Sequence, residues 1–284
     1  MTPFDISPSR FRAKKLVRRL AVGLGRRIGP PSSPATGAIR VLTYHRFGHA
    51  PLDPCCLDPD AFDWQMAWLA AHANVLTPED FDHVMSGRRP APSNSILITI
   101  DDGHASVEEY ALAALDRHGF KAVLFVCPSL CDDAAVADGV DSAFLGWSAL
   151  ARAVSSGHTI APHGHTHRSL GRMPLADAIR EVEAARTALA DHLRISGTFF
   201  SFPFGTRADY SDALADALSE RGFRYCFTSG HGRCIPQQRS VLLPRIKIEG
   251  GSELDMFPDM VRGCIDHWRF VDAACSLLQQ RGRM

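Results

Sequence analysis

The sequence lacks any long uninterrupted apolar run. No stretch approaches the length of a transmembrane helix, and arginines near the N-terminus break each candidate signal-peptide core. It also lacks Cys-x-x-Cys spacing, although it holds eight cysteines, including the pair Cys55-Cys56. Scattered cysteines of this kind form no recognisable zinc or disulfide framework. They favour reduced thiols, and we therefore expect a cytoplasmic protein.

Net charge is absent as well, because 31 Lys and Arg balance 31 Asp and Glu. A neutral chain is not obviously a nucleic-acid binder, so we expect no nucleic-acid partner. No internal repeat is present. What the chain does have is 284 residues with 45% apolar content, which fits one α/β domain with short extensions, or two small domains.

The charge is unevenly spread, since the first 31 residues hold eight basic side chains and only Asp5 as an acid. Residues 10–28 are predicted to form a basic helix, and 29–38 a Pro-rich linker. Apolar residues spaced three or four apart gather on one side of that helix: Ala13, Leu16, Val17, Leu20, Ala21, Leu24 and Ile28. This pattern is typical of a helix on an anionic membrane surface, here the inner membrane. A solvated tail is the alternative.

The rest of the chain is organised around the stretch Ser95 to Gly103. Its apolar and β-branched residues predict a buried strand that ends in Asp101-Asp102-Gly103. Folds with parallel strands build their sites at the carboxyl ends of those strands. Neighbouring acids at a strand end point to opposite sides, so Asp101 and Asp102 need not share a role. A simple turn is the alternative interpretation.

A second cluster is His163 and His167 in the run Pro162-His-Gly-His-Thr-His167. Four residues make one helical turn, so both imidazoles can face one ion. Two His and one Asp form a normal ligand set for Zn²⁺ with an open position for water. A third apolar run, 198–205, ends in a Pro/Gly loop.

Strand and helix patterns alternate along the chain, which predicts an α/β fold with parallel strands. Strands are expected at 39–47, 95–100, 121–127, 224–228 and 242–248. Helices are expected at 61–71, 106–118, 147–155, 174–193, 209–221 and, for the most part, 253–280.

Taken together, three motifs resemble those of the polysaccharide deacetylases (the NodB-homology domain, carbohydrate esterase family 4). They are Thr99-Ile-Asp-Asp-Gly103, His163-x-x-x-His167 and Phe202-Pro-Phe-Gly205, in that order. The resemblance covers roughly 39–248, so we expect a basic segment and linker at 1–38, a catalytic domain at 39–250 and a helical extension at 251–284. It implies an irregular (β/α) barrel of about seven strands, similar to a TIM barrel.

The resemblance also implies an activity, which is metal-dependent removal of N-acetyl groups from an amino sugar in a polysaccharide or lipid-linked glycan. It assigns Asp102, His163 and His167 as ligands of a divalent metal, with Zn²⁺ expected, and Asp101 as the catalytic base. A metal suits this reaction because it polarises the amide carbonyl and lowers the pKa of water. A glycan-binding module of the same fold without activity is the alternative, and hydrolysis of a different amide or ester is a third.

The sequence departs from the family pattern in two places. Many members carry Arg two residues before the Pro of the third motif, where this chain has Ser201, and a late Leu-x-His is missing. We expect Arg245 to replace the missing Arg, with a mild effect on turnover. His45 is the first candidate for the general acid and His231 the second. Trp147 and Phe204 are candidate sugar-stacking residues, although both residue types are more often found in cores.

Overall fold

The computed structural model describes residues 8–28, 37–50, 52–131, 143–250, 254–266 and 268. All strand pairs in named strands of these ranges are parallel, which confirms the expected α/β class. The strands are β1 (Ile39–Tyr44), β2 (Arg46–Phe47), β3 (Cys56–Leu57), β4 (Asn74–Val75), β5 (Ser95–Ile100), β6 (Val123–Val126), β7 (Thr159–Pro162), β8 (Phe199–Ser201), β9 (Tyr225–Phe227), β10 (Leu242–Leu243) and β11 (Ile246–Lys247).

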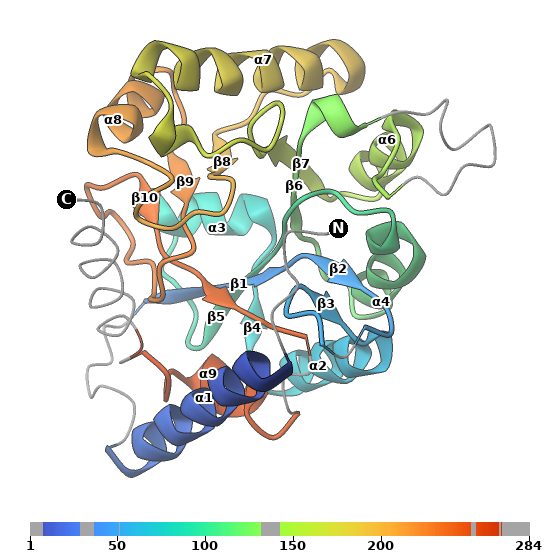
Figure 1. Cartoon of the computed structure of the whole chain (residues 1–284), viewed down its shortest axis with the longest axis vertical. Coiled ribbons are helices and arrows are strands. Elements are labelled where there is room, and N and C mark those ends of the chain that lie inside the picture. Colours follow the sequence, from blue (N-terminus) through green and yellow to red (C-terminus); the bar gives the residue numbers. More distant parts are fainter. Residues whose placement is uncertain are drawn as a thin grey trace.

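The main strands follow one another around a barrel-like ring (Figure 1). One sheet has the order β11-β1-β5-β6-β7, the other the order β10-β9-β8, and β7 lies beside β8. The expected last strand, 242–248, is interrupted at Pro244 and Arg245. Its first half, β10, pairs with β9 and its second half, β11, pairs with β1. This broken strand therefore joins the two sheets, and counting β10 and β11 as one position gives seven positions around the ring.

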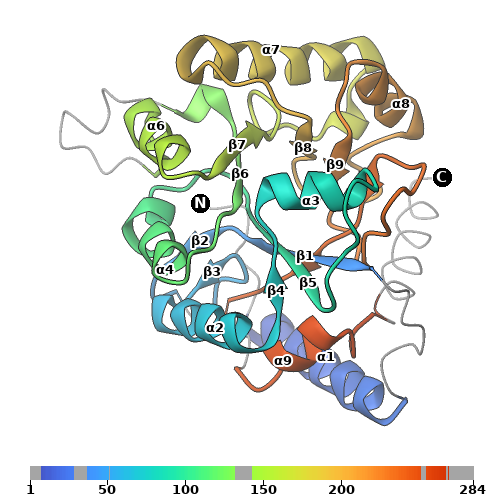
Figure 2. The same cartoon turned by 180° about the vertical axis from the view of Figure 1, so that it is seen from behind.

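Side chains that alternate along each strand face either the inside of this ring or the surrounding helices. The inner face of the ring is apolar on the side toward α3 (Pro78–Met85). There Val41, Leu97, Phe125 and Phe227 form one core cluster with residues of that helix. Phe81 of α3 is fully buried in that cluster. Helix α3 thus closes one end of the ring, as the two opposite views show (Figures 1 and 2).

Helices cover the outside of the strands, largely where the sequence predicts them. They are α2 (Pro59–His72), α4 (Ala113–Arg117, which continues the helical segment Val107–Leu112), α6 (Trp147–Ser155), α7 (Leu175–Leu193) and α8 (Asp212–Glu220). N-terminal capping residues fix where several helices begin. The side chains of Asp58, Thr77 and Ser211 accept hydrogen bonds from backbone amides in the first turns of α2, α3 and α8. The second core cluster lies beneath this layer and contains the other faces of β1, β5 and β6.

The described parts of the segments before β1 and after β11 pack against each other and against the core. Helix α1 (Pro8–Ile28) lies beside α9 (Phe257–Arg262), and Val22 shares the core cluster of Phe257, Met260 and Ile265. The long helix expected over 253–280 is, in the described part, the six residues of α9; the remainder falls mostly outside the described residues, as does the linker expected at 29–38 apart from its last two residues. Among the described residues, no helix is both long and apolar enough to cross a bilayer.

Candidate active site

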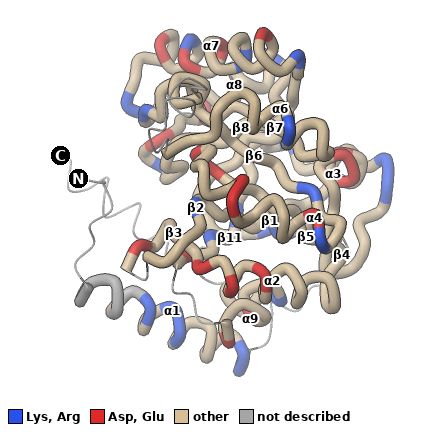
Figure 3. Tube along the Cα trace, turned by 90° about the vertical axis from the view of Figure 1, so that its right-hand side faces the viewer, with Lys and Arg blue, Asp and Glu red and all other residues tan. Residues whose placement is uncertain are grey.

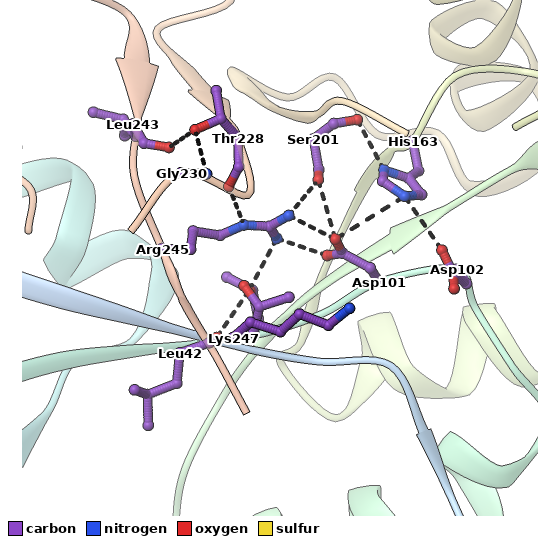
Figure 4. A network of polar contacts seen from close by, with 12 residues as sticks. Leu42, Asp101, Asp102, His163, Ser201, Thr228, Gly230, Leu243, Arg245 and Lys247 are labelled. Carbon is purple, nitrogen blue, oxygen red and sulfur yellow. Dashed lines mark hydrogen bonds and ion pairs between the residues drawn. The ribbon is translucent and has the colours of Figure 1, made fainter. Parts of the chain in front are cut away.

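Polar side chains replace apolar ones where the inner face reaches the carboxyl ends of the strands. Asp101 follows Leu97 and Thr99 along β5, His163 follows Ala161 on β7, and Ser201 follows Phe199 on β8. Arg245 follows Leu243 at the break between β10 and β11. The period of two along a strand carries each of these side chains inward. Residues far apart in sequence therefore meet at one end of the ring (Figure 4).

Asp101 and Arg245 form a buried, bidentate pair. Arg245 Nη1 donates to Asp101 Oδ1 at 2.8 Å, and Nη2 donates to Oδ2 at 2.7 Å. The two residues are only 2% and 3% exposed, so the pair is shielded from water. Arg245 Nε also donates to the carbonyl oxygen of Thr228 at 3.0 Å. A planar guanidinium held at both ends fixes the plane of the carboxylate, which Lys at this position would not do.

Ser201 completes this group but brings no charge. Its Oγ accepts from Arg245 Nη2 at 3.0 Å and lies 3.3 Å from Asp101 Oδ2. Burial alone would raise the pKa of Asp101, but the charge of Arg245 and, after it, that of His163 outweigh burial and lower this pKa. Asp101 is therefore ionised at neutral pH. Arg245 lies where it can orient Asp101, the task expected of it in place of the Arg missing at 201.

Asp102 faces away from Arg245 and toward the histidine pair. Its Oδ1 lies 3.3 Å from His163 Nε2 and 3.2 Å from His167 Nε2. The expectation that one helical turn aligns the two imidazoles is wrong, because residues 163–167 form a loop after β7. In that loop Gly164 and His167 have φ values of +71° and +57°, in the left-handed region. This reversal of the backbone, rather than a helix, brings both rings to Asp102.

The donor set fits a divalent metal ion. One nitrogen or oxygen from each of Asp102, His163 and His167 lies within 4.8 Å of the others. Two ligands at ordinary zinc distances of about 2.0–2.1 Å in a tetrahedron are separated by about 3.3 Å, close to the separations of Asp102 from each histidine. His163 Nδ1 lies 2.8 Å from the carbonyl oxygen of Ser201, which leaves Nε2 to face the site. Such a partner is typical of metal-binding histidines.

The two histidines considered as acids lie in different surroundings. His45 is on the inner face, one residue beyond β1, and within the described residues its Nδ1 has no hydrogen-bond partner. Burial and the charge of Lys247 lower the pKa of His45 to about 4, so it is neutral at pH 7. Burial also lowers the pKa of His231 to about 4, and the charges acting on it are those of Asp266, Arg18 and Arg40. None of these three belongs to the cluster around Asp101 and Asp102.

Lys247 is a residue of this region that sequence reasoning missed. It follows Leu243 and Arg245 in the same alternation and is in register with Thr43 of β1. Its Nζ lies 3.7 Å from Cys55 Sγ, and its charge acts on His45. The side chain extends below the Asp101–Arg245 pair (Figure 4). The alternation 243, 245, 247 was the signal that would have found it.

The two candidate sugar-stacking residues lie in different environments, one packed on the core and one exposed beside the site. Trp147 lies against His192, with ring centres 3.9 Å apart, between α6 and α7, and packs on the core. Phe204 is 46% exposed, and its ring centre is 4.8 Å from that of His167. Phe204 therefore lies at the mouth of the site, where an aromatic face can pack against a sugar ring. The backbone amide of His165 donates to Glu181, and this hydrogen bond holds His165 away from the mouth of the site.

Replacing Arg245 by Met should destabilise the protein by about 3–5 kcal/mol, because the buried Asp101 carboxylate would lose its partner. This expected loss concerns folding stability, whereas the mild effect expected from the sequence concerns turnover. The measurement is urea unfolding of the wild type, Arg245→Met, Asp101→Asn and the double variant. The double variant should recover much of the loss, since no buried charge is then unpaired. Destabilisation by less than about 1 kcal/mol in Arg245→Met would contradict this account of the pair.

Comparisons with known proteins give one family match and several solved structures of similar fold. Residues 88–226 match the family model described as polysaccharide deacetylase. Among solved structures, deacetylase PplD of Streptococcus pyogenes, in complex with acetate, is 18% identical, with 81% of this chain and 99% of that chain covered and a TM-score of 0.69. IcaB from Ammonifex degensii is 19% identical, with 81% and 97% covered and a TM-score of 0.67.

A de-N-acetylase from Aggregatibacter actinomycetemcomitans is 15% identical, with 76% of this chain and 96% of that chain covered and a TM-score of 0.66. At these identities the structures show a shared fold. No curated protein is similar enough in sequence to be matched to this chain.

The fold and the matched segment define the class of protein: an α/β domain of parallel strands with the polysaccharide deacetylase architecture. Residues 88–226 carry the polysaccharide deacetylase domain, and the solved structures share its fold over most of the chain.

Proposed function

We propose that the protein is a metal-dependent hydrolase that removes N-acetyl groups from an amino-sugar glycan. One observation carries the proposal. The orienting pair Asp101–Arg245 and the ligand set Asp102, His163 and His167 meet at one point, where Asp101 Oδ2 lies 4.0 Å from His163 Nε2. An ionised carboxylate beside a metal site is the arrangement that hydrolysis by water requires.

Each residue of the site has a distinct task in this reaction. Asp102, His163 and His167 would hold the ion, which would polarise the acetamide carbonyl and make a bound water more acidic. Asp101 Oδ2 accepts the proton of the attacking water. Its lowered pKa keeps it ionised, although it makes the carboxylate a weaker base. Arg245 and Ser201 hold the carboxylate plane in place while the proton moves.

The amine leaves well only if it takes up a proton, so a donor is needed on the other side of the acetyl group. His45, the first candidate from the sequence, is neutral at pH 7 because its pKa is lowered to about 4. A neutral imidazole holds no readily donated proton. Lys247 brings an ammonium group to the same end of the ring, beside His45. We therefore assign proton donation to Lys247, with His45 as a polar neighbour facing the substrate.

Lys247→Met should lower acetamide hydrolysis about a hundredfold and change hydrolysis of an activated aryl acetate only a few-fold. The reason is that a phenolate leaves without a proton, whereas an amine does not. The measurement is the ratio of the two rates in wild type, Lys247→Met and His45→Ala, each with its metal content checked. A selective loss in His45→Ala with an unchanged ratio in Lys247→Met would return the role to His45.

The activity itself is tested by incubating the purified full chain with an N-acetylglucosamine oligomer and measuring acetate. Acetate should appear, stop when the metal is removed by a chelator, and return when Zn²⁺ is added. The control is Asp101→Asn, which should release none above background. A folded, metal-loaded protein that binds the oligomer and releases no acetate would instead support the second candidate, a glycan-binding module. Ser201 and the missing late His are the observations that favour that candidate.

A further inference from the structure

Helix α1 is packed on the domain through its polar side. Arg18 is buried, its Nη1 forms an ion pair with Glu249 at 2.9 Å, and its Nη2 donates to the carbonyl oxygen of Lys247 at 3.0 Å. About two turns later, Arg26 Nε donates to Asp259 Oδ2 at 2.7 Å. Among the α1 side chains that the structure describes, Val22 is the one buried apolar side chain.

The side facing away from the domain is apolar, which is the reverse of an ordinary surface helix. Leu16, Val17, Leu20 and Leu24 are 58%, 51%, 66% and 59% exposed. We call these four residues the α1 stripe. They are spaced so that they follow one another along about two turns of one face. The other exposed large apolar side chains of the described residues are scattered over different elements: Leu52, Trp64, Leu175, Phe204, Ile235 and Leu254.

The same helix carries positive charge and no acid. The sequence of α1 contains eight Lys and Arg and neither Asp nor Glu, and the described part appears in Figure 3 with Lys and Arg as its only charged positions. Arg18 and Arg26 form ion pairs with Glu249 and Asp259 of the domain. Arg19 and Arg27 are exposed beside the α1 stripe. An apolar face bordered by cations complements a lipid surface with anionic headgroups, whose acyl boundary accepts leucines and whose phosphates attract arginines.

We propose that the α1 stripe is a docking surface for an anionic membrane, and that the domain binds there as a fixed body. The fixed attachment follows from packing as well as from the ion pairs. A Cβ on Gly25 would lie 1.8 Å from the carbonyl oxygen of Cys264, so α1 and the α9 region are in direct contact. Arg18 links the helix to Lys247 and Glu249, at the end of the strand that follows Arg245. Membrane binding would thus set the orientation of the active-site end of the ring, independently of catalysis.

The test is co-sedimentation of the full chain with vesicles of phosphatidylglycerol and phosphatidylcholine. The wild type should pellet with vesicles rich in phosphatidylglycerol and stay in solution with pure phosphatidylcholine. Leu16→Gln/Leu20→Gln/Leu24→Gln should lower the partition coefficient on the order of a hundredfold. The matched control Leu175→Gln/Ile235→Gln, which changes exposed apolar residues elsewhere, should bind as the wild type does.

Arg27→Glu provides a second variant that leaves the packed side of α1 intact. It should weaken binding to the anionic vesicles by roughly thirtyfold, because two units of charge change near the headgroups. Equal pelleting of the wild type and both α1 variants, or no pelleting of the wild type at low salt, would overturn the proposal. So would a dimer in solution that the triple substitution dissociates when no vesicles are bound, since a second copy would then cover the stripe.

Discussion

Asp101→Asn should lower deacetylation about a thousandfold while the bound metal stays in place. The amide keeps the shape of the carboxylate and can still accept from Arg245, but it cannot take up the proton of water. The structure supports this separation of base from ligands, because Asp101 pairs with Arg245 whereas Asp102 faces His163 and His167. The measurements are kcat on an N-acetylglucosamine oligomer and metal content by mass spectrometry.

A matched control for this substitution is Asp63→Asn, because Asp63 is an exposed acid on α2 that pairs with Arg117 far from the ring interior. It should retain full activity. Asp102→Asn should differ from Asp101→Asn, because it should lose both metal and activity. The assigned roles would be wrong if Asp101→Asn emptied the metal site and Asp102→Asn left it filled.

His163→Ala and His167→Ala should each lower metal affinity by more than about a hundredfold, because each removes one of three protein ligands. The purified wild type should hold about one divalent ion per chain, with Zn²⁺ expected. Affinity is measured by competition with a chromogenic chelator, and folding by circular dichroism. We expect both variants to stay folded and to lose turnover in proportion to the metal lost.

His165→Ala supplies the matched control, since His165 lies between the two ligands in the same loop. Its backbone amide, rather than its ring, is used to hold the loop against Glu181. It should therefore keep its metal. Loss of metal in His165→Ala as large as in His163→Ala would mean that the loop, and not the two rings facing Asp102, determines affinity.

The strands were predictable because their signal is local. Short apolar runs such as Ser95–Ile100 bury both faces, and helix starts such as Thr77 carry their own capping group. The break at Pro244 and Arg245 was not predictable from local pattern. Both halves read as one apolar run, and only pairing with β9 on one side and β1 on the other divides them. The packing of α1 also depends on distant partners, Glu249 and Asp259.

Local sequence pattern also predicts only part of the site. Asp101, Asp102 and the histidine pair could be placed at strand ends from the sequence, because motif order and alternation locate them. The sequence suggested the wrong local geometry for His163 and His167, since a spacing of four fits a helix and a tight loop equally well. His45 was chosen for residue type and position, and its lowered pKa arises from burial and from the charge of Lys247 on another strand, which the sequence around His45 does not reveal.

The interrupted strand also has a consequence for how the protein is made. Leu42 of β1 is synthesised 204 residues before its partner Ile246. Until then one edge of β1 is unpaired, and Asp101 has no guanidinium to neutralise it. Pairing across such a sequence separation is slow, and open strand edges invite association between chains. Closure by β11 should therefore be a late event in folding. Nascent chains that stop short of Arg245 would be the aggregation-prone species, which a chaperone would need to shield.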